Sequence, residues 1–416
     1  MLIDNNTLRT TIQRIFLFVL MWYAFFASST IILRPYASTV WVILAIISFF
    51  FRDISTFKVS KLIFGYITLI IFLLFNTLIS QDVSSSVLLV FKFILYFVIA
   101  YNIACNSSTR SITIKMAFVF LLIHLFIIYF QLAFPSVFNS VFLGLIPQSA
   151  SLLVIKRVSL HMAIGFNTQT GIAGFWMTLG LIFSLVYSKY RTDKKIIYRL
   201  LTALFAIAII LTRKRIFVLI FIIIILLFEL LTTKKSGRSF KIVVTSLIIV
   251  FLFYLASSIF PNLFGVIDKM TQLLEEDDVS NGRFQLYETA LNLFKENALF
   301  GVGYGAFGTV SGLGVGVHNA YLQALVEFGL AGFFVFWIPI VKGLSISFNT
   351  VRSFVASNGE IFSCDSIITF LGQIVIMLWC FTGNPFIDDT VLFIFILLQM
   401  INISYSNRNH KVGKTI

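Results

Sequence analysis

Apolar segments long enough to cross a lipid bilayer recur along the whole chain of 416 residues. Hydrophobic residues make up 59% of the sequence, and a water-soluble domain could not bury that much apolar side chain. The pattern predicts an all-α, polytopic integral membrane bundle of about twelve transmembrane helices. We expect residues 1–416 to form a single membrane domain. The predicted spans lie near residues 14–33, 38–51, 62–79, 86–104, 116–134, 168–188, 196–212, 216–232, 241–260, 320–345, 365–382 and 387–405.

Basic residues in the short connections predict the orientation of the bundle. Lys and Arg gather in every second connection, whereas loops such as Gln81–Asp82 and 384–389 are nearly free of them. Because basic loops stay in the cytoplasm, both termini are predicted to be cytoplasmic. This bias and attraction to anionic lipids account for much of the net charge of +14, which is not a nucleic-acid signal. The basic residues that set the orientation are Arg9, Arg14, Arg52, Lys58, Lys61, Arg110, Lys115, Lys189, Arg191, Lys194, Lys195, Lys234, Lys235, Arg238, Lys241, Lys342, Arg352, Arg408, Lys411 and Lys414.

The tripeptide Arg213-Lys214-Arg215 breaks this rule, because it joins two predicted spans on the extracytoplasmic side. Basic side chains at helix ends commonly reach lipid phosphates, which is one interpretation. The turn is short, however, so at least one side chain should point into the bundle, where a guanidinium can bind a phosphate through two hydrogen bonds. We expect Arg215, which begins the next helix, to do so, and Arg213 and Lys214 to meet lipid head groups.

Two long outside connections, near 135–167 and 261–319, have room for chemistry. The second contains Glu275-Glu276-Asp277-Asp278, which is interpreted as a solvated helix face and not a metal site, since no His or Cys accompanies it. An amphipathic surface helix is predicted over roughly 282–296, with Phe284, Tyr287, Leu291 and Phe294 at helical spacing. Arg283 opens this helix, where it could bind an anion or form a salt bridge with the acidic stretch.

The same connection ends in a glycine-rich segment and a histidine. Gly301-Val302-Gly303-Tyr304-Gly305 is a flexible turn whose glycines should let the loop fold back onto the mouth of the bundle. His318 lies at the outer end of the next span, where an imidazole is suited to proton transfer near neutral pH. Asn319 beside it could supply a further hydrogen bond to a ligand, and Tyr304 is another candidate substrate contact.

The remaining histidines, acidic residues and cysteines give weaker signals. His161 is a reserve candidate on the first outside connection, His124 is expected to hydrogen-bond a neighbouring helix, and His410 lies in the tail. Asp388 and Asp389 are interpreted as solvating a polar turn, with metal binding as the alternative. We expect no disulfide framework and no thiol metal site from Cys105, Cys364 and Cys380, since no pair lies in an outside loop.

Several of these motifs together resemble the bacterial O-antigen polymerase and O-antigen ligase superfamily. His318-Asn319 followed by Gly329 and Gly332 is similar to the superfamily's His-Asn and spaced-glycine signature, while Leu211-Thr212-Arg213-Lys214-Arg215 and Gly282-Arg283 resemble its two arginine motifs. The resemblance covers residues 196–345 in the expected order, and the N-terminal half only by helix count. Many members have Ser where Lys214 stands, which makes this anion site more basic.

The resemblance implies glycosyl transfer outside the bacterial cytoplasmic (inner) membrane, from an undecaprenyl-diphosphate-linked glycan to a sugar hydroxyl. Arg215 and Arg283 would meet the charge of the diphosphate leaving group, His318 would act as the base, and inversion without a metal or cofactor is expected. The expected partners are the lipid-linked glycan, an acceptor glycan or lipid A-core, the bilayer, and accessory proteins in the form of a chain-length regulator and a flippase.

Three functions stay open on the sequence. A polymerase, which we favour, passes the growing chain to the next lipid-linked repeat unit, whereas a ligase passes it to the lipopolysaccharide core. A flippase or transporter would also fit a helical bundle with external arginines, but should show inverted repeats or charges at mid-span. We find no repeat, and Lys92, His124 and Glu229 are the main mid-span candidates.

Overall fold

The computed structural model describes residues 5–27, 36–52, 61–191, 193–233, 283–356 and 361–412, whose secondary structure is helical, without a strand. The main helices are α1 (Asn5–Trp22), α2 (Ala37–Ser48), α3 (Lys61–Leu78), α4 (Val83–Cys105), α5 (Ser107–Ala133), α6 (Pro135–Phe142), α7 (Gln148–Ser159), α8 (Thr170–Tyr190), α9 (Lys195–Leu211), α10 (Arg215–Thr232), α13 (Arg283–Glu296), α14 (Phe307–Val310), α15 (Ala320–Ala356), α16 (Ile361–Trp379) and α17 (Asp389–Val412). The fold class predicted from the sequence, all-α, is confirmed.

Each predicted span that falls within the described residues coincides with a helix. Five of them, α4, α5, α8, α10 and α15, are long and apolar enough to cross a membrane by length and composition. Apolar helical stretches of 10–17 residues lie in α2, α3, α16 and α17. The predicted span at 241–260 lies outside the described residues. The number of twelve spans and the orientation in the membrane stay predictions.

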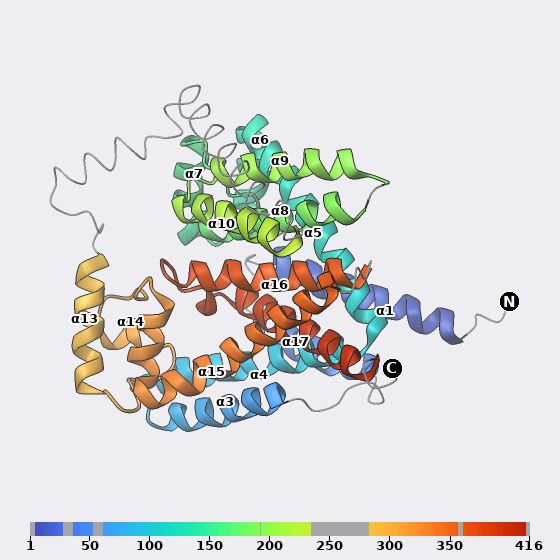
Figure 1. Ribbon diagram of the computed structural model, residues 1–416. Coiled ribbons are helices and arrows are strands. Elements are labelled where there is room, and N and C mark those ends of the chain that lie inside the picture. Colours follow the sequence, from blue (N-terminus) through green and yellow to red (C-terminus); the bar gives the residue numbers. More distant parts are fainter. Residues whose placement is uncertain are drawn as a thin grey trace.

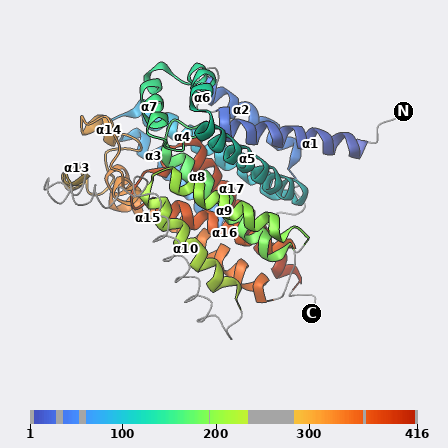
Figure 2. The ribbon, with the colours of Figure 1, turned by 90° about the horizontal axis from the view of Figure 1, so that it is seen from above.

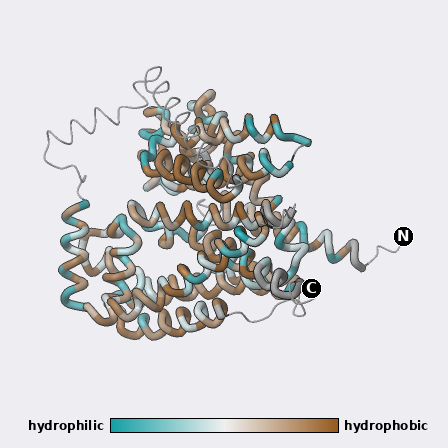
Figure 3. Tube along the Cα trace, in the orientation of Figure 1, coloured by the Kyte–Doolittle hydropathy of each residue, from teal (hydrophilic) through white to brown (hydrophobic). Residues whose placement is uncertain are grey.

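The helices that carry the candidate residues cluster at one end of the molecule. Both ribbon views place α13 and α14 at one end and the two chain termini toward the other (Figure 1, Figure 2). Most of the bundle helices run roughly between these two ends, and α7 lies toward the end occupied by α13. Hydrophobic residues dominate the long helices, while hydrophilic residues gather near helix ends and on α13 (Figure 3).

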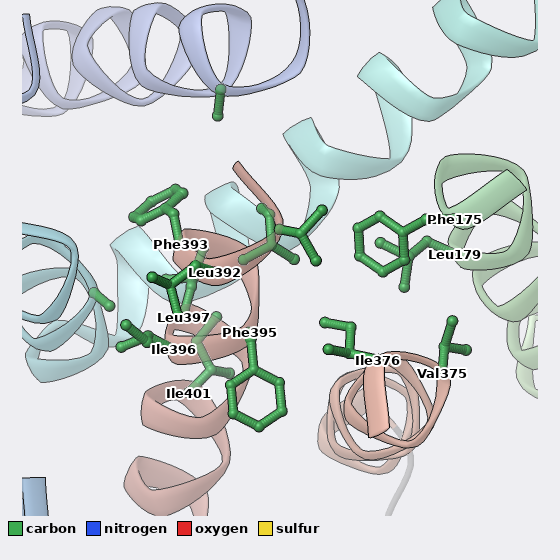
Figure 4. Packing of buried hydrophobic residues seen from close by; sticks show 14 of the residues in the cluster. Phe175, Leu179, Val375, Ile376, Leu392, Phe393, Phe395, Ile396, Leu397 and Ile401 are labelled. Carbon is green, nitrogen blue, oxygen red and sulfur yellow. The ribbon is translucent and has the colours of Figure 1, made fainter. Parts of the chain in front are cut away.

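Helix α8 is the centre of the packing, and two of its glycines set the positions of α9 and α10. Phe175 and Leu179 of α8 face Val375 and Ile376 of α16, next to the apolar residues of α17 (Figure 4). A Cβ added at Gly180 would lie 2.1 Å from the Phe205 ring of α9, and one at Gly174 would lie 2.6 Å from the Phe217 ring of α10. Both rings therefore need a glycine opposite them, and this packing fixes the turn between α9 and α10.

Helix α15 is broken at Gly329, whose φ of 64° and ψ of −173° are not helical. The break leaves backbone N–H and C=O groups of α15 without helical partners, and the loop before α14 forms hydrogen bonds with them. Val302 and Gly303 donate N–H to the carbonyls of Val326 and Glu327 at 3.0 Å each. Leu330 and Ala331 donate to the carbonyls of Ala298 and Leu299 at 2.8 and 3.2 Å. Backbone groups at a helix break need such replacement partners, and here the glycine-rich loop supplies them.

The glycines of this loop allow it to fold back onto the bundle, as the sequence predicted. Gly303 has a φ of 109°, and a Cβ there would lie 2.0 Å from the hydroxyl oxygen of Ser80 in the turn between α3 and α4. The backbone N–H of Gln81 donates to the carbonyl of Val302 at 2.9 Å. Asn76 donates to the carbonyl of Phe300 at 3.1 Å and accepts from the N–H of Tyr304 at 2.9 Å. The loop is thus attached to α3 as well as to α15.

The surface helix predicted over roughly 282–296 is present as α13, which also packs on protein. Phe284 and Leu291 are 69% and 45% exposed, whereas Ala290 is fully buried. Helix α13 packs on the glycine-rich loop, α14 and the first half of α15 through a small separate core, so those elements select the buried face. That core consists of Ala290, Val302, Ala306, Phe307, Val317 and Val326, with Tyr287, Leu293, Phe294, Val310 and Leu322 packed against it.

Candidate active site

The turn between α9 and α10 presents Lys214 to the other basic residues of this end. Arg213 adopts a left-handed φ of 55°, and α10 begins after Lys214 without a side-chain cap. Lys214 is exposed, but the surrounding protein displaces water from it. That desolvation, with the positive charges of Arg157 and Arg283, lowers the pKa of Lys214. The uncapped start of α10 adds the positive end of an 18-residue helix dipole at the same place.

Arg157, near the end of α7, is a member of the site that the sequence patterns above did not identify. It is half-buried, its guanidinium donates to the carbonyl of Thr168, and burial lowers its pKa. The loop after α7 is attached to the basic turn, since the N–H of Ala163 donates to the carbonyl of Leu211 at 2.9 Å. The signal was present in the sequence, because Lys156-Arg157 places two basic residues in a predicted outside connection.

His318 shares this electrostatic environment. Its side chain is exposed and its φ is 59°. Desolvation by the surrounding protein, followed by the charges of Arg283 and Lys214, lowers the pKa of His318. The next residue but one, Ala320, donates its N–H to the carbonyls of Cys380 and Gly383 at 2.9 and 3.1 Å, which fixes the start of α15 on the end of α16.

One basic cluster is therefore formed by four residues from four segments. They are Arg157 of α7, Lys214 of the α9–α10 turn, Arg283 of α13 and His318 of the loop before α15. Within the described ranges no ion pair joins a carboxylate to any of these four residues, so their charge is not neutralised there. No group of His, Cys, Asp and Glu able to hold a metal ion occurs among the same residues. Such an excess of positive charge favours an anionic ligand.

Backbone strain accompanies the basic residues of this end. In the described part of the chain, the non-glycine residues with positive φ are His161, Arg213 and His318, at 53°, 55° and 59°. The left-handed region costs an ordinary residue roughly 1–2 kcal/mol, and such residues are concentrated at functional sites. The sequence alone already makes all three residues candidates for the site. Their backbone strain is a separate, structural observation about the same three positions.

Two predictions about the basic turn need adjustment. Arg215 is the exposed first residue of α10, and the electrostatic effects on His318 come from Arg283 and Lys214. Both Lys214 and Arg215 are exposed, and it is Lys214 that shares the electrostatic environment of His318. The Nε atom of Arg213 is buried, with no hydrogen-bond partner among the described residues. A role for Arg215 at the diphosphate stays a prediction.

The structure gives two candidate substrate contacts a structural role. The side-chain oxygen of Asn319 caps α15, accepting from the N–H groups of Tyr321 and Leu322 at 3.0 and 3.1 Å. Tyr304 is 5% exposed and packs its ring on Phe328, and a contact from it to a substrate stays a prediction. His161 is exposed on the loop after α7 and stays a candidate. Gly282 and the acidic stretch 275–278 lie outside the described residues, and so does a salt bridge from Arg283 to that stretch.

The acidic and mid-span residues have partners in the bundle. Asp388 is not a solvating residue, because its carboxylate caps α17 by accepting from Thr390 and Val391 N–H at 3.1 and 3.0 Å. Asp389 pairs with Lys92 at 2.8 Å, which removes an unpaired mid-span charge. His124 hydrogen-bonds the carbonyl of Phe25 at 3.2 Å, in agreement with the prediction of a contact to a neighbouring segment. Glu229 accepts from the hydroxyl of Thr233 at 2.8 Å.

The comparison with known protein families agrees with the site. Residues 200–337 match the O-antigen ligase family. This match supports the O-antigen polymerase and ligase superfamily. The matched stretch contains the basic turn, Arg283, His318 and the break at Gly329, whereas Arg157 lies before it. That superfamily consists of membrane glycosyltransferases of the ligase and polymerase kind, which supports a membrane enzyme in general terms. No curated protein is similar enough to be matched.

Proposed function

We propose that this superfamily member is a polysaccharide polymerase of the bacterial cytoplasmic (inner) membrane. It transfers glycan from undecaprenyl diphosphate to the terminal hydroxyl of a lipid-linked repeat unit, on the extracytoplasmic side. The observation that supports this proposal is the convergence of three cations and one histidine at one end of an apolar helical bundle. A diphosphate leaving group matches the charge of that cluster, and the apolar helices suit its polyprenyl chain.

The cluster contains the groups that an inverting transfer needs. In a single displacement, the acceptor oxygen bonds to the anomeric carbon as the bond from that carbon to the diphosphate oxygen breaks. Arg157, Lys214 and Arg283 stabilise the negative charge that develops on the leaving diphosphate. His318 accepts the proton of the acceptor hydroxyl, and its lowered pKa keeps the imidazole neutral and ready to do so near pH 7. No step in this scheme uses a metal ion.

The experiment is a transfer assay with protein purified into lipid nanodiscs. A lipid-linked repeat unit alone should give a ladder of products that increase by one unit, and lipid A-core should not be needed. Product that forms only when lipid A-core is present would support the O-antigen ligase alternative. Movement of the lipid-linked glycan across a vesicle membrane without any new glycosidic bond would support a flippase and contradict the proposal.

A further inference from the structure

A chain of buried hydrogen bonds connects Glu327 to the segment that carries His318. Glu327, in the first half of α15, is 2% exposed, and its carboxylate accepts from the amide nitrogen of Gln323 at 2.8 Å. The amide oxygen of Gln323, itself 6% exposed, accepts from the backbone N–H of Val317 at 3.2 Å. Val317 directly precedes His318. Glu327 thus reaches the histidine's backbone through one intervening side chain.

The polarity of this chain is fixed by the backbone N–H of Val317. A backbone N–H only donates, so the oxygen end of Gln323 must face Val317. The NH2 end of Gln323 then faces Glu327 and donates to its carboxyl oxygen. The backbone amides of Gly305 and Phe307 also stabilise the charge of Glu327 by hydrogen bonding. The same carboxylate therefore holds both the glycine-rich loop and the His318 segment.

The His318 segment depends on such support because its backbone is strained. His318 has a φ of 59°, a conformation that persists only where the surroundings impose it. Gly316 lies against the same amide, since a Cβ there would lie 2.8 Å from the Gln323 oxygen and 2.4 Å from the Asn384 side-chain nitrogen. A reversed Gln323 would place its NH2 group against the Val317 N–H, donor against donor, and this would displace the segment.

We propose that Glu327 is a positioning residue for glycosyl transfer, which acts through Gln323 to hold the backbone of Val317 and His318 in the conformation that aims the imidazole at the acceptor hydroxyl. This inference rests on the proposed function, in which His318 is the base. It concerns the orientation of the imidazole and not the binding of the diphosphate, because the Glu327 carboxylate is buried among hydrogen-bond donors of the loop and of Gln323.

The test is a swap of the two side chains. In Glu327→Gln the new amide can turn its NH2 group to the Gln323 oxygen and reverse Gln323, and in Gln323→Glu two buried carboxylates face each other. Each single variant should lower kcat by about tenfold to a hundredfold, the scale for a misplaced catalytic group, while KM for the lipid-linked donor stays within about twofold.

The double variant, which combines Glu327→Gln with Gln323→Glu, should rescue the activity. The carboxylate at position 323 then accepts from the N–H of Val317 and from the amide at position 327, so every hydrogen bond again has a donor and an acceptor. We expect its kcat to return to within about threefold of wild type. A merely structural role for either side chain would not produce this reciprocal rescue.

Two further variants keep the test decisive if a single variant does not fold. Gln323→Met removes the hydrogen-bonded link at similar side-chain volume and should lower kcat in the same way. The control is Gln373→Glu in α16, where the buried wild-type amide donates a hydrogen bond to Ser347. This control should leave the turnover per folded enzyme molecule unchanged. Wild-type kcat in a folded Gln323→Met protein, or a double variant as slow as the single ones with an unchanged Tm, would overturn the positioning role. A wild-type protein that forms no glycosidic bond would instead contradict the proposed function itself.

Discussion

At the scale of single residues, the candidate site combines Arg157, Lys214, Arg283 and His318 from four separate segments of the chain. Arg213-Lys214-Arg215 stands out because it violates the charge rule, and Arg283 and His318 because of their places at helix starts. Which side chain of the triplet faces the others could not be predicted, since that depends on the left-handed φ of Arg213 and on the glycines of α8 that position the turn. Arg157 obeys the same charge argument and was missed because a pair of basic residues is a weaker signal than three.

Removal of one cation from the basic cluster should lower activity without affecting membrane insertion. Arg157→Ala, Lys214→Ala and Arg283→Ala should each reduce kcat by about a hundredfold, the usual effect of losing one donor to a developing negative charge. Lys156→Ala is the matched control, because Lys156 is exposed on the same helix and neighbours Arg157 in sequence. Turnover measured with equal amounts of purified protein checks this. Equal loss in the Lys156 variant would indicate a general effect of surface charge.

The pH dependence of the reaction should move when a cation is removed. Desolvation by the surrounding protein, followed by the charges of Arg283 and Lys214, lowers the pKa of His318, so the wild-type base stays neutral to a lower pH than an ordinary histidine. In Lys214→Gln one of these positive charges is gone and the pKa of His318 rises. The acid limb of kcat should therefore shift to higher pH, with activity lost earlier as the pH falls. An unchanged acid limb in the pH–rate profile would mean that another group titrates.

At the scale of elements, sequence periodicity predicted where helices lie more reliably than which face each one buries. Every predicted span among the described residues is a helix, because apolar runs of this length have few alternatives in a membrane. The face of α13 that carries Ala290 is buried against protein while Phe284 and Leu291 are exposed, and the sequence pattern did not predict this protein contact. The partner of that face is a glycine-rich loop from elsewhere in the chain, and no local pattern describes it. The break in α15 was likewise set by long-range hydrogen bonds.

The glycine-rich loop should tolerate substitution only where it has free space. Gly303→Ala places a Cβ against Ser80 in a left-handed backbone, and we expect a loss of about 3 kcal/mol or more of stability. Gly312 has a φ of 69° but nothing within 4 Å, so Gly312→Ala should cost only about 1 kcal/mol of backbone strain. Thermal unfolding of both variants in the same detergent compares them. Equal Tm values would show that the loop does not pack on the α3–α4 turn.

At the scale of the whole molecule, the arrangement separates a basic, strained end from an end that carries both termini. The two ribbon views agree that α13 and the termini lie at opposite ends (Figure 1, Figure 2). The prediction from loop charges assigns the first end to the outside and the second to the cytoplasm. The assignment depends on the bilayer and on the insertion machinery as well as on the fold, so it needs a measurement in the membrane.

Labelling of single cysteines in intact cells tests this orientation. The three native cysteines are buried, which keeps the background low. A membrane-impermeant maleimide should label Glu288→Cys, exposed on α13, in spheroplasts. Asp193→Cys, exposed between α8 and α9, should react only after permeabilisation. The reverse pattern would place the basic cluster in the cytoplasm and contradict an extracytoplasmic reaction.

The central claim is that His318 and the basic cluster carry out glycosyl transfer without a metal ion. The most direct test is the rate of glycosidic bond formation from a lipid-linked repeat unit by wild-type and His318→Ala protein, each in excess chelator. We predict that chelator leaves the wild-type rate unchanged and that His318→Ala is slower by about a hundredfold to ten-thousandfold at equal expression and Tm. A wild-type rate that falls in chelator and returns with magnesium or manganese, or a fully active His318→Ala protein, would contradict the claim.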